Sequence, residues 1–358
     1  MNVLMLIRAT AFDVQGGDTI QARATARYLR HAGVEVDLKL TSESIDYSEY
    51  QLIHFFNIIR PADILPHIEK SKLPFVISPI FVDYSEFDKK ARKGIAGSLA
   101  RLVSNDFLEY LKAIARMAVN KEMIRSRDYL LWGHKKSIRY LIKNSSFLLP
   151  NSESEIMRLF NHYNIRNKYN VIPNGIDTEI FKEQNTPEKK RNGVICVGQI
   201  HGLKNQLNLI RAMNKTDLPL TIIGKPTLNG KSYYEQCRRQ AGGNIRFVNF
   251  LAQEELVKCY RQAKVHVLPS WFETTGLSSL EAAAMGCNIV ITRKGDAFEY
   301  FGDLATYCEP ESVESIRQAV LDAHSRQASP GLRDMIFARY TWKKAAEATL
   351  EAYKTTLS

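Results

Sequence analysis

The sequence lacks several patterns that mark common functional classes. Its 5 cysteines include no Cys-x-x-Cys pair, and no His, Cys and carboxylate residues are spaced as metal ligands are. It has no apolar run near the roughly 20 residues that a membrane-spanning helix requires. An Asp-x-Asp triplet and a Gly-x-Ser-x-Gly nucleophile elbow are also absent. We therefore expect reduced thiols in a cytoplasmic protein, with no metal or other cofactor and no serine triad.

Length and composition indicate an ordinary globular protein of two domains. A chain of 358 residues exceeds one typical hydrophobic core, and 45% hydrophobic with 24% charged residues excludes general disorder. The apolar N-terminus resembles a signal peptide. However, Arg8 interrupts it and a glycine loop follows, so a first core strand is the better interpretation.

The net positive charge lies mainly in one segment. Residues 89–143 hold 14 Lys and Arg against 4 Asp and Glu, whereas the rest of the chain holds 35 against 34. Apolar residues recur there at three- and four-residue steps, which is typical of an amphipathic helix. Such a surface suits the anionic headgroups of a membrane. A solvated helical face packed on its own domain is the alternative, and nucleic acid ranks last because no nucleic-acid motif accompanies the charge.

Both halves of the chain alternate strand-like and helix-like stretches. This alternation predicts an α/β fold with two Rossmann-like, doubly wound parallel-sheet domains that face each other across a cleft. We expect an N-terminal domain over residues 1–168 and a C-terminal domain over 169–340. A last helix at about 341–358 is expected to pack back on the first domain. In that domain, Ser152 or Asn151 should cap a helix with Glu155 in its first turn.

One turn in the second half combines small residues with two glutamates. Gly276, Leu277 and Ser278 stand where the strand-like VHVLP gives way to a helix, and N–H groups at a helix start attract phosphate. Glu281 falls one turn into that helix, whereas Glu273 precedes it. One carboxylate could therefore accept ribose hydroxyls and the other sugar hydroxyls. The alternative is a plain strand-to-helix turn whose acidic first turn suits the helix dipole.

A resemblance to a known family favours the first interpretation. The stretch FETTGLSSLEAAAMG resembles the Glu-x7-Glu region of the retaining family-4 glycosyltransferases, which have the GT-B fold. Other stretches follow in the order that this family uses: QGGDTIQARATARYLRHAGVEV, PNSES, VIPNGID, VGQIHGLKNQLNLI, LTIIG, FLAQEELVKCYRQAKVHVLPS and YTWKKAAEATLEAY. The resemblance covers the second half almost completely and the first half mainly at its ends.

The resemblance implies a role for each residue of the turn. Glu281 would bind the ribose of a nucleotide-diphosphate sugar, and Glu273 would contact the transferred sugar. Backbone groups of Leu277 and Ser278, next to Gly276, would hold the diphosphate.

Three further residues match positions of the family, Gly16 and Gly17 in donor binding and Lys204 in catalysis. Gly16 and Gly17 would let a loop of the first domain approach the diphosphate. Lys204 matches the lysine that neutralises the leaving diphosphate, since negative charge grows on the departing oxygen as the glycosidic bond breaks.

The sequence departs from the family pattern at two places. Gln199 stands where the family usually has an arginine, and it brings no charge; Lys225 and His201 are possible substitutes. The first-domain histidine of the family is also missing. His54 and Asp83 are the nearest candidates for the acceptor side, although an isolated histidine at a strand end is more often structural.

The resemblance implies a metal-independent transferase that moves a sugar, with retention, from a nucleotide-diphosphate donor to a glycan or lipid-linked acceptor. Segment 89–143 lies in the acceptor domain. It motivates the hypothesis of surface-polysaccharide or lipopolysaccharide assembly at the cytoplasmic face of a membrane. A GT-B nucleotide-sugar epimerase or hydrolase is one alternative. A catalytically silent sugar-nucleotide-binding subunit is the other, and only Gln199 favours it.

Overall fold

The structure is a computed structural model that describes residues 1–13, 16–82, 106, 110–111, 126–182, 191–228 and 230–358. These residues form two compact units. The first comprises Met1–Pro173 together with Trp342–Ser358, and the second comprises Asn174–Thr341. Asp83 and most of the basic segment 89–143 lie outside the described residues.

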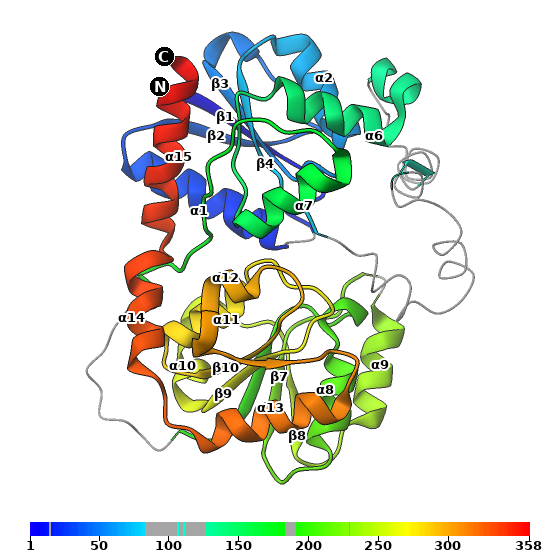
Figure 1. The fold of residues 1–358 in the computed structure, drawn as a ribbon, viewed down its shortest axis with the longest axis vertical. Coiled ribbons are helices and arrows are strands. Elements are labelled where there is room, and N and C mark those ends of the chain that lie inside the picture. The colour runs from blue at the N-terminus through cyan, green and yellow to red at the C-terminus, as the bar shows by residue number, and fades with distance from the viewer. Residues whose placement is uncertain (14–15, 83–105, 107–109, 112–125, 183–190, 229) are drawn as a thin grey trace. The chain divides into compact units, whose positions relative to one another are not determined.

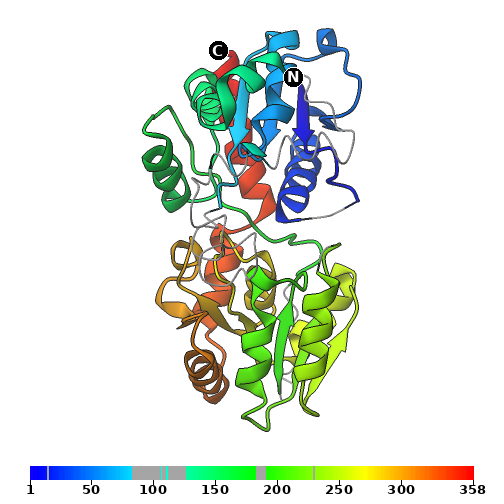
Figure 2. The same cartoon turned by 90° about the vertical axis from the view of Figure 1, so that its right-hand side faces the viewer.

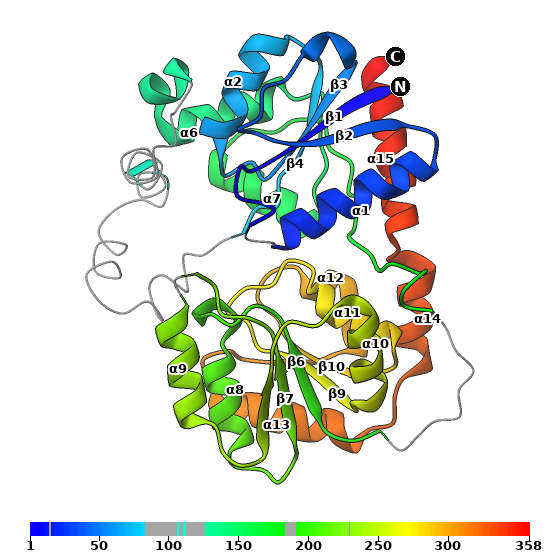
Figure 3. The same cartoon turned by 180° about the vertical axis from the view of Figure 1, so that it is seen from behind.

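The first unit is built on a five-stranded parallel sheet of order β2-β1-β3-β4-β5 (Figure 1). Its elements are β1 (Asn2–Ile7), α1 (Gly17–His31), β2 (Glu35–Leu40), η1 (Tyr47–Glu49), β3 (Leu52–Phe56), α2 (Pro61–Ser71), β4 (Phe75–Ser78), α6 (Arg127–Asn144), β5 (Phe147–Leu148), α7 (Glu153–Tyr163) and α15 (Trp342–Leu357). The crossovers from β1 to β2 and from β3 to β4 run in opposite directions, so right-handed connections place α1 and α2 on opposite faces. α15 packs on α1 (Figure 3), and α6 packs on α2.

The start of α7 shows how a local sequence pattern becomes a helix cap. The Glu155 N–H donates to Ser152 Oγ (3.0 Å), and the Asn151 N–H donates to Glu155 Oε2 (2.7 Å). The Phe81 N–H donates to the other oxygen of this buried carboxylate (2.9 Å). The predicted cap at Ser152 is confirmed, and it also joins α7 to the chain that follows β4.

The second unit is built on a six-stranded parallel sheet of order β11-β10-β9-β6-β7-β8. Its elements are β6 (Val194–Val197), η2 (Gly202–Lys204), α8 (Gln206–Met213), β7 (Leu220–Ile223), α9 (Lys231–Gln240), β8 (Ile245–Val248), α10 (Gln253–Gln262), β9 (Val265–Leu268), α11 (Leu277–Ala284), β10 (Asn288–Thr292), α12 (Ala297–Phe301), η3 (Gly302–Leu304), β11 (Thr306–Cys308), α13 (Val313–Ser325) and α14 (Pro330–Arg339). Each unit carries helices on both faces of its sheet (Figures 1 and 2). The inner strands β3, β6 and β9 are therefore buried on both sides, as their continuous apolar composition requires.

The strand order of the second unit reverses between β6 and β9. The chain proceeds outward from β6 through β7 to β8, then returns and proceeds outward from β9 through β10 to β11. Ligands of doubly wound sheets bind at such a switch point, outside the carboxyl ends of the strands. A ligand site is therefore expected in the loops that follow β6 and β9.

The expected fold class is confirmed, because both units are α/β with parallel sheets. Among the helices of the described residues, none combines the length and the apolar character needed to cross a bilayer.

Candidate active site

Lys204 and Glu273 meet at the switch point of the second sheet. Lys204 ends η2, after β6, and Glu273 lies in the loop between β9 and α11. Lys204 Nζ is 2.7 Å from Glu273 Oε2, and Ser270 Oγ donates to the same oxygen (2.9 Å). The Glu273 side chain is only 8% exposed, so this ion pair is shielded from most solvent. The two residues that the sequence proposed for catalysis are therefore in direct contact.

The loops that carry this pair are fastened to each other through the backbone. The Trp271 N–H donates to Leu203 O (2.9 Å), which ties the loop after β9 to η2. Asn205 Nδ2 donates to Pro269 O (3.0 Å) and to Pro310 O (2.8 Å). Asn205 adopts a left-handed conformation (φ 59°), which asparagine tolerates better than most residues. These contacts hold Lys204 and Glu273 on loops with little freedom.

The backbone of Glu273 is held on its other side by the loop after β10. The Glu273 N–H donates to Lys294 O (3.1 Å), and the Asp296 N–H donates to Glu273 O (2.8 Å). Gly295 lies between these two contacts with φ 99°, and a Cβ there would lie 2.1 Å from Glu273 O. Only glycine fits this position. Sequence reasoning missed Ser270, Asn205 and Gly295, although the left-handed preferences of glycine and asparagine were visible signals.

The predicted phosphate loop begins α11. Gly276 caps this helix in a left-handed conformation (φ 70°), and Leu277 and Ser278 are its first two residues. A helix of this kind leaves its first N–H groups without partners inside the helix, which suits an anion. The Ser279 and Leu280 N–H groups already donate to Gly276 O. The N–H groups of Leu277 and Ser278 are thus the ones that the geometry offers to a ligand.

Glu281 has hydrogen-bond partners of its own, which come from α10. Gln253 Nε2 donates to Glu281 Oε1 (2.9 Å), and Tyr260 Oη donates to Glu281 Oε2 (3.2 Å). Burial raises the pKa of Glu281 to about 7, and the two hydrogen bonds act in the opposite direction. The carboxyl group therefore titrates near neutral pH.

Gln199, which stands where the family usually has an arginine, carries no positive charge. Gln199 O accepts a hydrogen bond from Gln206 Nε2 (2.9 Å). Burial, and next the neighbouring Lys204, lower the pKa of His201 to about 4. His201 is therefore neutral at pH 7 and adds no positive charge to the site. Lys225 is exposed, with Nζ 5.5 Å from the centre of the Phe250 ring, and it is still a candidate cation.

A second lysine lies among the same loops of the second unit. Lys294 Nζ is 5.9 Å from the centre of the Trp271 ring and 3.4 Å from Glu311 Oε1.

Within the described residues, no group of three His, Cys, Asp or Glu side chains has the arrangement of a metal site.

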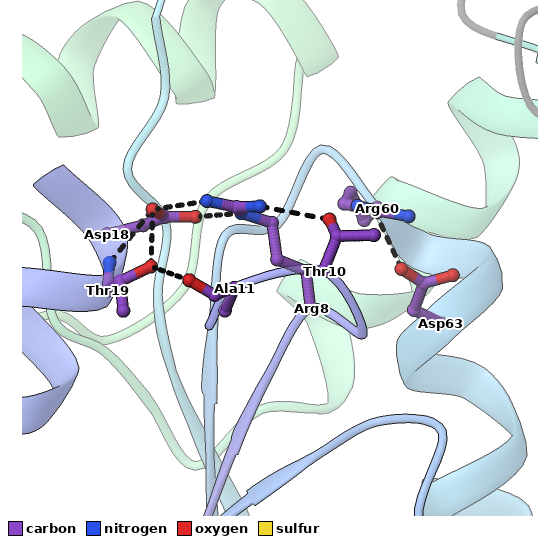
Figure 4. A network of polar contacts seen from close by, with 7 residues as sticks. All are labelled: Arg8, Thr10, Ala11, Asp18, Thr19, Arg60 and Asp63. Atoms are coloured by element: carbon purple, nitrogen blue, oxygen red, sulfur yellow. Dashed lines mark hydrogen bonds and ion pairs between the residues drawn. The ribbon is translucent and has the colours of Figure 1, made fainter. Parts of the chain in front are cut away.

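In the first unit, Gly16 and Gly17 begin α1. Gly16 caps the helix, and a Cβ at this position would lie 2.8 Å from Asp18 Oδ1. Asp18 forms a two-point ion pair with Arg8, which follows β1 (Nε to Oδ2 2.7 Å, Nη2 to Oδ1 3.2 Å; Figure 4). Arg8 also donates to Thr10 Oγ1 (3.0 Å), so this pair joins both ends of the glycine loop.

Figure 4 also shows a second ion pair nearby in the same unit. Arg60 Nε lies 2.6 Å from Asp63 Oδ2, and Asp63 stands in the first turn of α2.

His54 lies in the core of the first unit. Its Nδ1 is 2.7 Å from Tyr353 Oη, its Nε2 is 2.9 Å from Ser78 Oγ, and its ring stacks on Phe56. Burial lowers its pKa to about 3, so the ring is neutral. Both ring nitrogens serve internal contacts, which favours the structural alternative. Asp83, the other candidate for the acceptor side, lies outside the described residues.

A known protein family resembles the second unit. Residues 177–345 match the family model described as "Glycosyl transferases group 1". The match lies over the second unit, and the two parallel α/β units have the architecture of the GT-B fold. The second unit therefore carries a region similar to the group 1 glycosyl transferases.

Individual relatives are distant in sequence. The chain is 28% identical to a D-inositol 3-phosphate glycosyltransferase of Corynebacterium jeikeium over 245 residues, which cover 60% of this chain and 58% of that relative. It is 24% identical to the protein of the same name from Arthrobacter sp. over 390 residues, with 94% and 90% covered. The match to the first relative thus spans less than two thirds of its length.

Solved structures show the same fold. A sucrose-phosphate synthase from Thermosynechococcus elongatus has a TM-score of 0.74 at 15% identity, with 99% of each chain covered. Anabaena Alr3699/HepE in complex with UDP and glucose has a TM-score of 0.70 at 13% identity, with 99% of this chain and 100% of that chain covered.

Proposed function

We propose that this chain is a retaining, metal-independent glycosyltransferase of family 4, which moves a sugar from a nucleotide-diphosphate donor to a glycan or lipid-linked acceptor. One observation carries the proposal: the Lys204 to Glu273 ion pair of 2.7 Å stands at the switch point of the second sheet, just before α11 begins at Leu277. A cation, a carboxylate and helix N–H groups are the parts that a sugar diphosphate needs. A related fold that binds UDP and glucose supports the choice of donor.

Each residue of the site receives a role in this proposal. The N–H groups of Leu277 and Ser278, beside Gly276, hold the diphosphate. Glu273 accepts a hydroxyl of the transferred sugar, and Glu281 accepts the ribose hydroxyls. In the first unit, Gly16 and Gly17 leave the start of α1 without side chains, which suits approach to an anion.

The chemical step is a displacement at the anomeric carbon. The acceptor hydroxyl oxygen forms a bond to this carbon while the bond from the carbon to the phosphate oxygen breaks. The hydroxyl proton passes to a diphosphate oxygen, and the nucleoside diphosphate leaves. Lys204 stabilises the negative charge that grows on the leaving oxygen, an effect worth about 100- to 1,000-fold in rate for one such donor.

The ion pair makes donor binding an exchange of partners. Without a donor, Lys204 and Glu273 neutralise each other at 2.7 Å. A bound diphosphate attracts Lys204, and this leaves Glu273 Oε2 with Ser270 and the sugar hydroxyl as partners. The site therefore presents its catalytic charges only when the donor arrives.

The described part of the basic segment supports a membrane-bound acceptor. On α6, Leu130 and Leu131 are 43% and 81% exposed just before a kink at Gly133 (φ 71°), and Lys135 and Lys136 are exposed just after it. Exposed leucines beside lysines suit an anionic lipid surface. In this proposal the enzyme acts in surface-polysaccharide or lipopolysaccharide assembly, as a cytoplasmic protein peripheral to the membrane.

Vesicle co-sedimentation tests the membrane contact. We expect recovery with anionic vesicles at low salt to exceed recovery with neutral vesicles, and to fall when Leu130 and Leu131 are both replaced by serine. Leu304→Ser, which removes an exposed leucine of the second unit, is the control and should change nothing. Equal recovery with both kinds of vesicle would refute the membrane contact and leave the transferase proposal standing.

The transferase proposal is tested by binding and then by product analysis. A thermal-shift screen across UDP-, GDP- and ADP-sugars should identify a donor, because a ligand raises stability with the logarithm of its saturation. Transfer with that donor should fall at least about 100-fold in Lys204→Ala and Glu273→Gln. Lys215→Ala and Glu235→Gln remove exposed charges of the same unit and serve as matched controls. Donor breakdown or epimerisation without an acceptor would instead establish a hydrolase or epimerase.

A further inference from the structure

Helix α10 holds the Glu281 carboxylate through two side chains. Gln253 and Tyr260 are seven residues apart, so they lie on the same face of the helix. Gln253 Nε2 donates to Oε1 (2.9 Å) and Tyr260 Oη donates to Oε2 (3.2 Å). Each carboxylate oxygen thus receives one hydrogen bond from the protein.

The pattern of these bonds determines what the carboxylate can still accept. An ionised carboxylate has about four acceptor positions, two on each oxygen. The protein occupies one acceptor position on each oxygen, and one acceptor position on each oxygen is left. Two acceptor positions on neighbouring oxygens match two neighbouring hydroxyl groups, as in the 2′,3′-diol of a ribose.

We propose that Tyr260 and Gln253 are positioning residues, which orient the Glu281 carboxylate so that it accepts both hydroxyls of the donor ribose at once. This inference rests on the proposed function, because it takes Glu281 as the ribose-binding residue. It adds two residues from α10 that touch no substrate and determine how tightly the donor binds.

Packing keeps Tyr260 in place. Its side chain is fully buried, and its ring lies 6.5 Å from Phe181 and 5.9 Å from His266, measured between ring centres. Cys287 Sγ also donates to Tyr260 O (3.1 Å), which holds the end of α10. The hydroxyl therefore has a fixed position, and orienting it costs little entropy when the donor binds.

The Arg191 guanidinium donates to Tyr260 O (3.1 Å) and stays charged, whereas the other buried titratable side chains beside Tyr260, apart from Glu281, are neutral at pH 7. Burial raises the pKa of Tyr260 well above its ordinary value and that of Cys287 to about 12, and it lowers the pKa of His266 to about 3. Glu281, with a pKa of about 7, is the group that changes charge near neutral pH. Only its ionised form accepts two hydroxyls, so donor affinity should rise as pH rises through about 7.

A pH series of donor binding tests the proposal. The probes are UDP-, GDP- and ADP-glucose, whose diphosphate diester keeps a constant charge between about pH 5.5 and 8.5. For the nucleotide sugar that binds, the wild-type Kd should be about tenfold weaker at pH 6 than at pH 8, which follows from a pKa of about 7.

In Tyr260→Phe the carboxylate loses one donor. Its Kd at pH 8 should weaken by about three- to tenfold, and the midpoint of the pH dependence should move upward by about half to one unit. The KM for the donor should rise in parallel while kcat changes little. Tyr307→Phe removes a hydroxyl that donates to Gly302 O in the same unit, and it should match the wild type in both quantities.

The outcomes separate the two proposals. If the wild type binds neither these three probes nor any nucleotide sugar of the thermal-shift screen at any pH, the proposed function is refuted. If it binds one, and folded Tyr260→Phe keeps the wild-type Kd and midpoint, the positioning role is overturned and the function stands. If Tyr260→Phe does not fold, Gln253→Leu applies the same test from the first residue of α10, which is only partly buried.

Discussion

Replacing Gly295 with alanine should damage the site without touching any side chain of it. Gly295 has φ 99°, and a Cβ would lie 2.1 Å from Glu273 O, 2.9 Å from Glu273 C and 3.0 Å from Glu273 N. These are backbone atoms and cannot rotate away. The loop after β10 must therefore separate from Glu273, and the hydrogen bonds to Lys294 O and from the Asp296 N–H must break.

The expected loss follows from these contacts. Two hydrogen bonds are worth about 1 kcal/mol each, and a left-handed alanine costs about 1 to 2 kcal/mol. If part of the strain relaxes, the free energy of unfolding falls by about 2 to 4 kcal/mol, or roughly 4 to 16 °C in Tm for a unit of this size. Glu273 also moves, and a displacement of about 1 Å at a catalytic group can cost about 100-fold in kcat/KM.

Two other glycines separate the effect of backbone strain from the effect of displacing Glu273. Gly243→Ala meets no atom within 4 Å and needs no left-handed backbone, so it should resemble the wild type. Gly302→Ala also meets no atom within 4 Å but has φ 49°, so it should show the backbone strain without the displacement of Glu273. Thermal unfolding and transfer kinetics on all three variants decide the matter. A Gly295→Ala protein with the Tm and kcat/KM of Gly243→Ala would refute the reasoning.

Three further outcomes are expected. Ser270→Ala removes one of two donors to Glu273 Oε2 and should lower kcat/KM by about five- to tenfold, measured at steady state; unchanged kinetics would exclude a positioning role for Ser270. Asp18→Asn removes the two-point ion pair with the partly buried Arg8 and should lower the free energy of urea unfolding by about 1.5 to 3 kcal/mol; a neutral effect would count against the two-point pair. His54 has a pKa of about 3 when folded and about 6.5 when unfolded, so the unfolded chain binds the extra proton and His54 makes stability fall as pH falls below 6.5. Between pH 7.5 and 5 it should contribute a loss of about 2 kcal/mol that His54→Gln lacks, and equal pH slopes for both proteins would contradict this.

The sequence by itself determined the architecture and the chemistry-bearing turn. Alternating apolar and amphipathic stretches predicted two parallel α/β units, since strand and helix periods are local properties of the chain. The turn that carries Glu273 could be singled out because it follows a predicted strand, and strand ends of parallel sheets gather at one edge, whereas Lys204 was marked only by the family resemblance. The family resemblance supplied their expected roles.

Only the tertiary structure decided which side chains support them. Ser270 and Lys204 share one oxygen of Glu273, and Tyr260 holds Glu281 from a neighbouring helix. His54 pairs with Tyr353, which lies 299 residues further along the chain. Such contacts depend on the strand order and on helix packing, which bring distant residues within about 3 Å, whereas periodicity and motif spacing describe only neighbours along the chain. No local sequence pattern marks Tyr260 as a supporting residue, because Glu281, which it contacts, becomes its neighbour only in the folded chain.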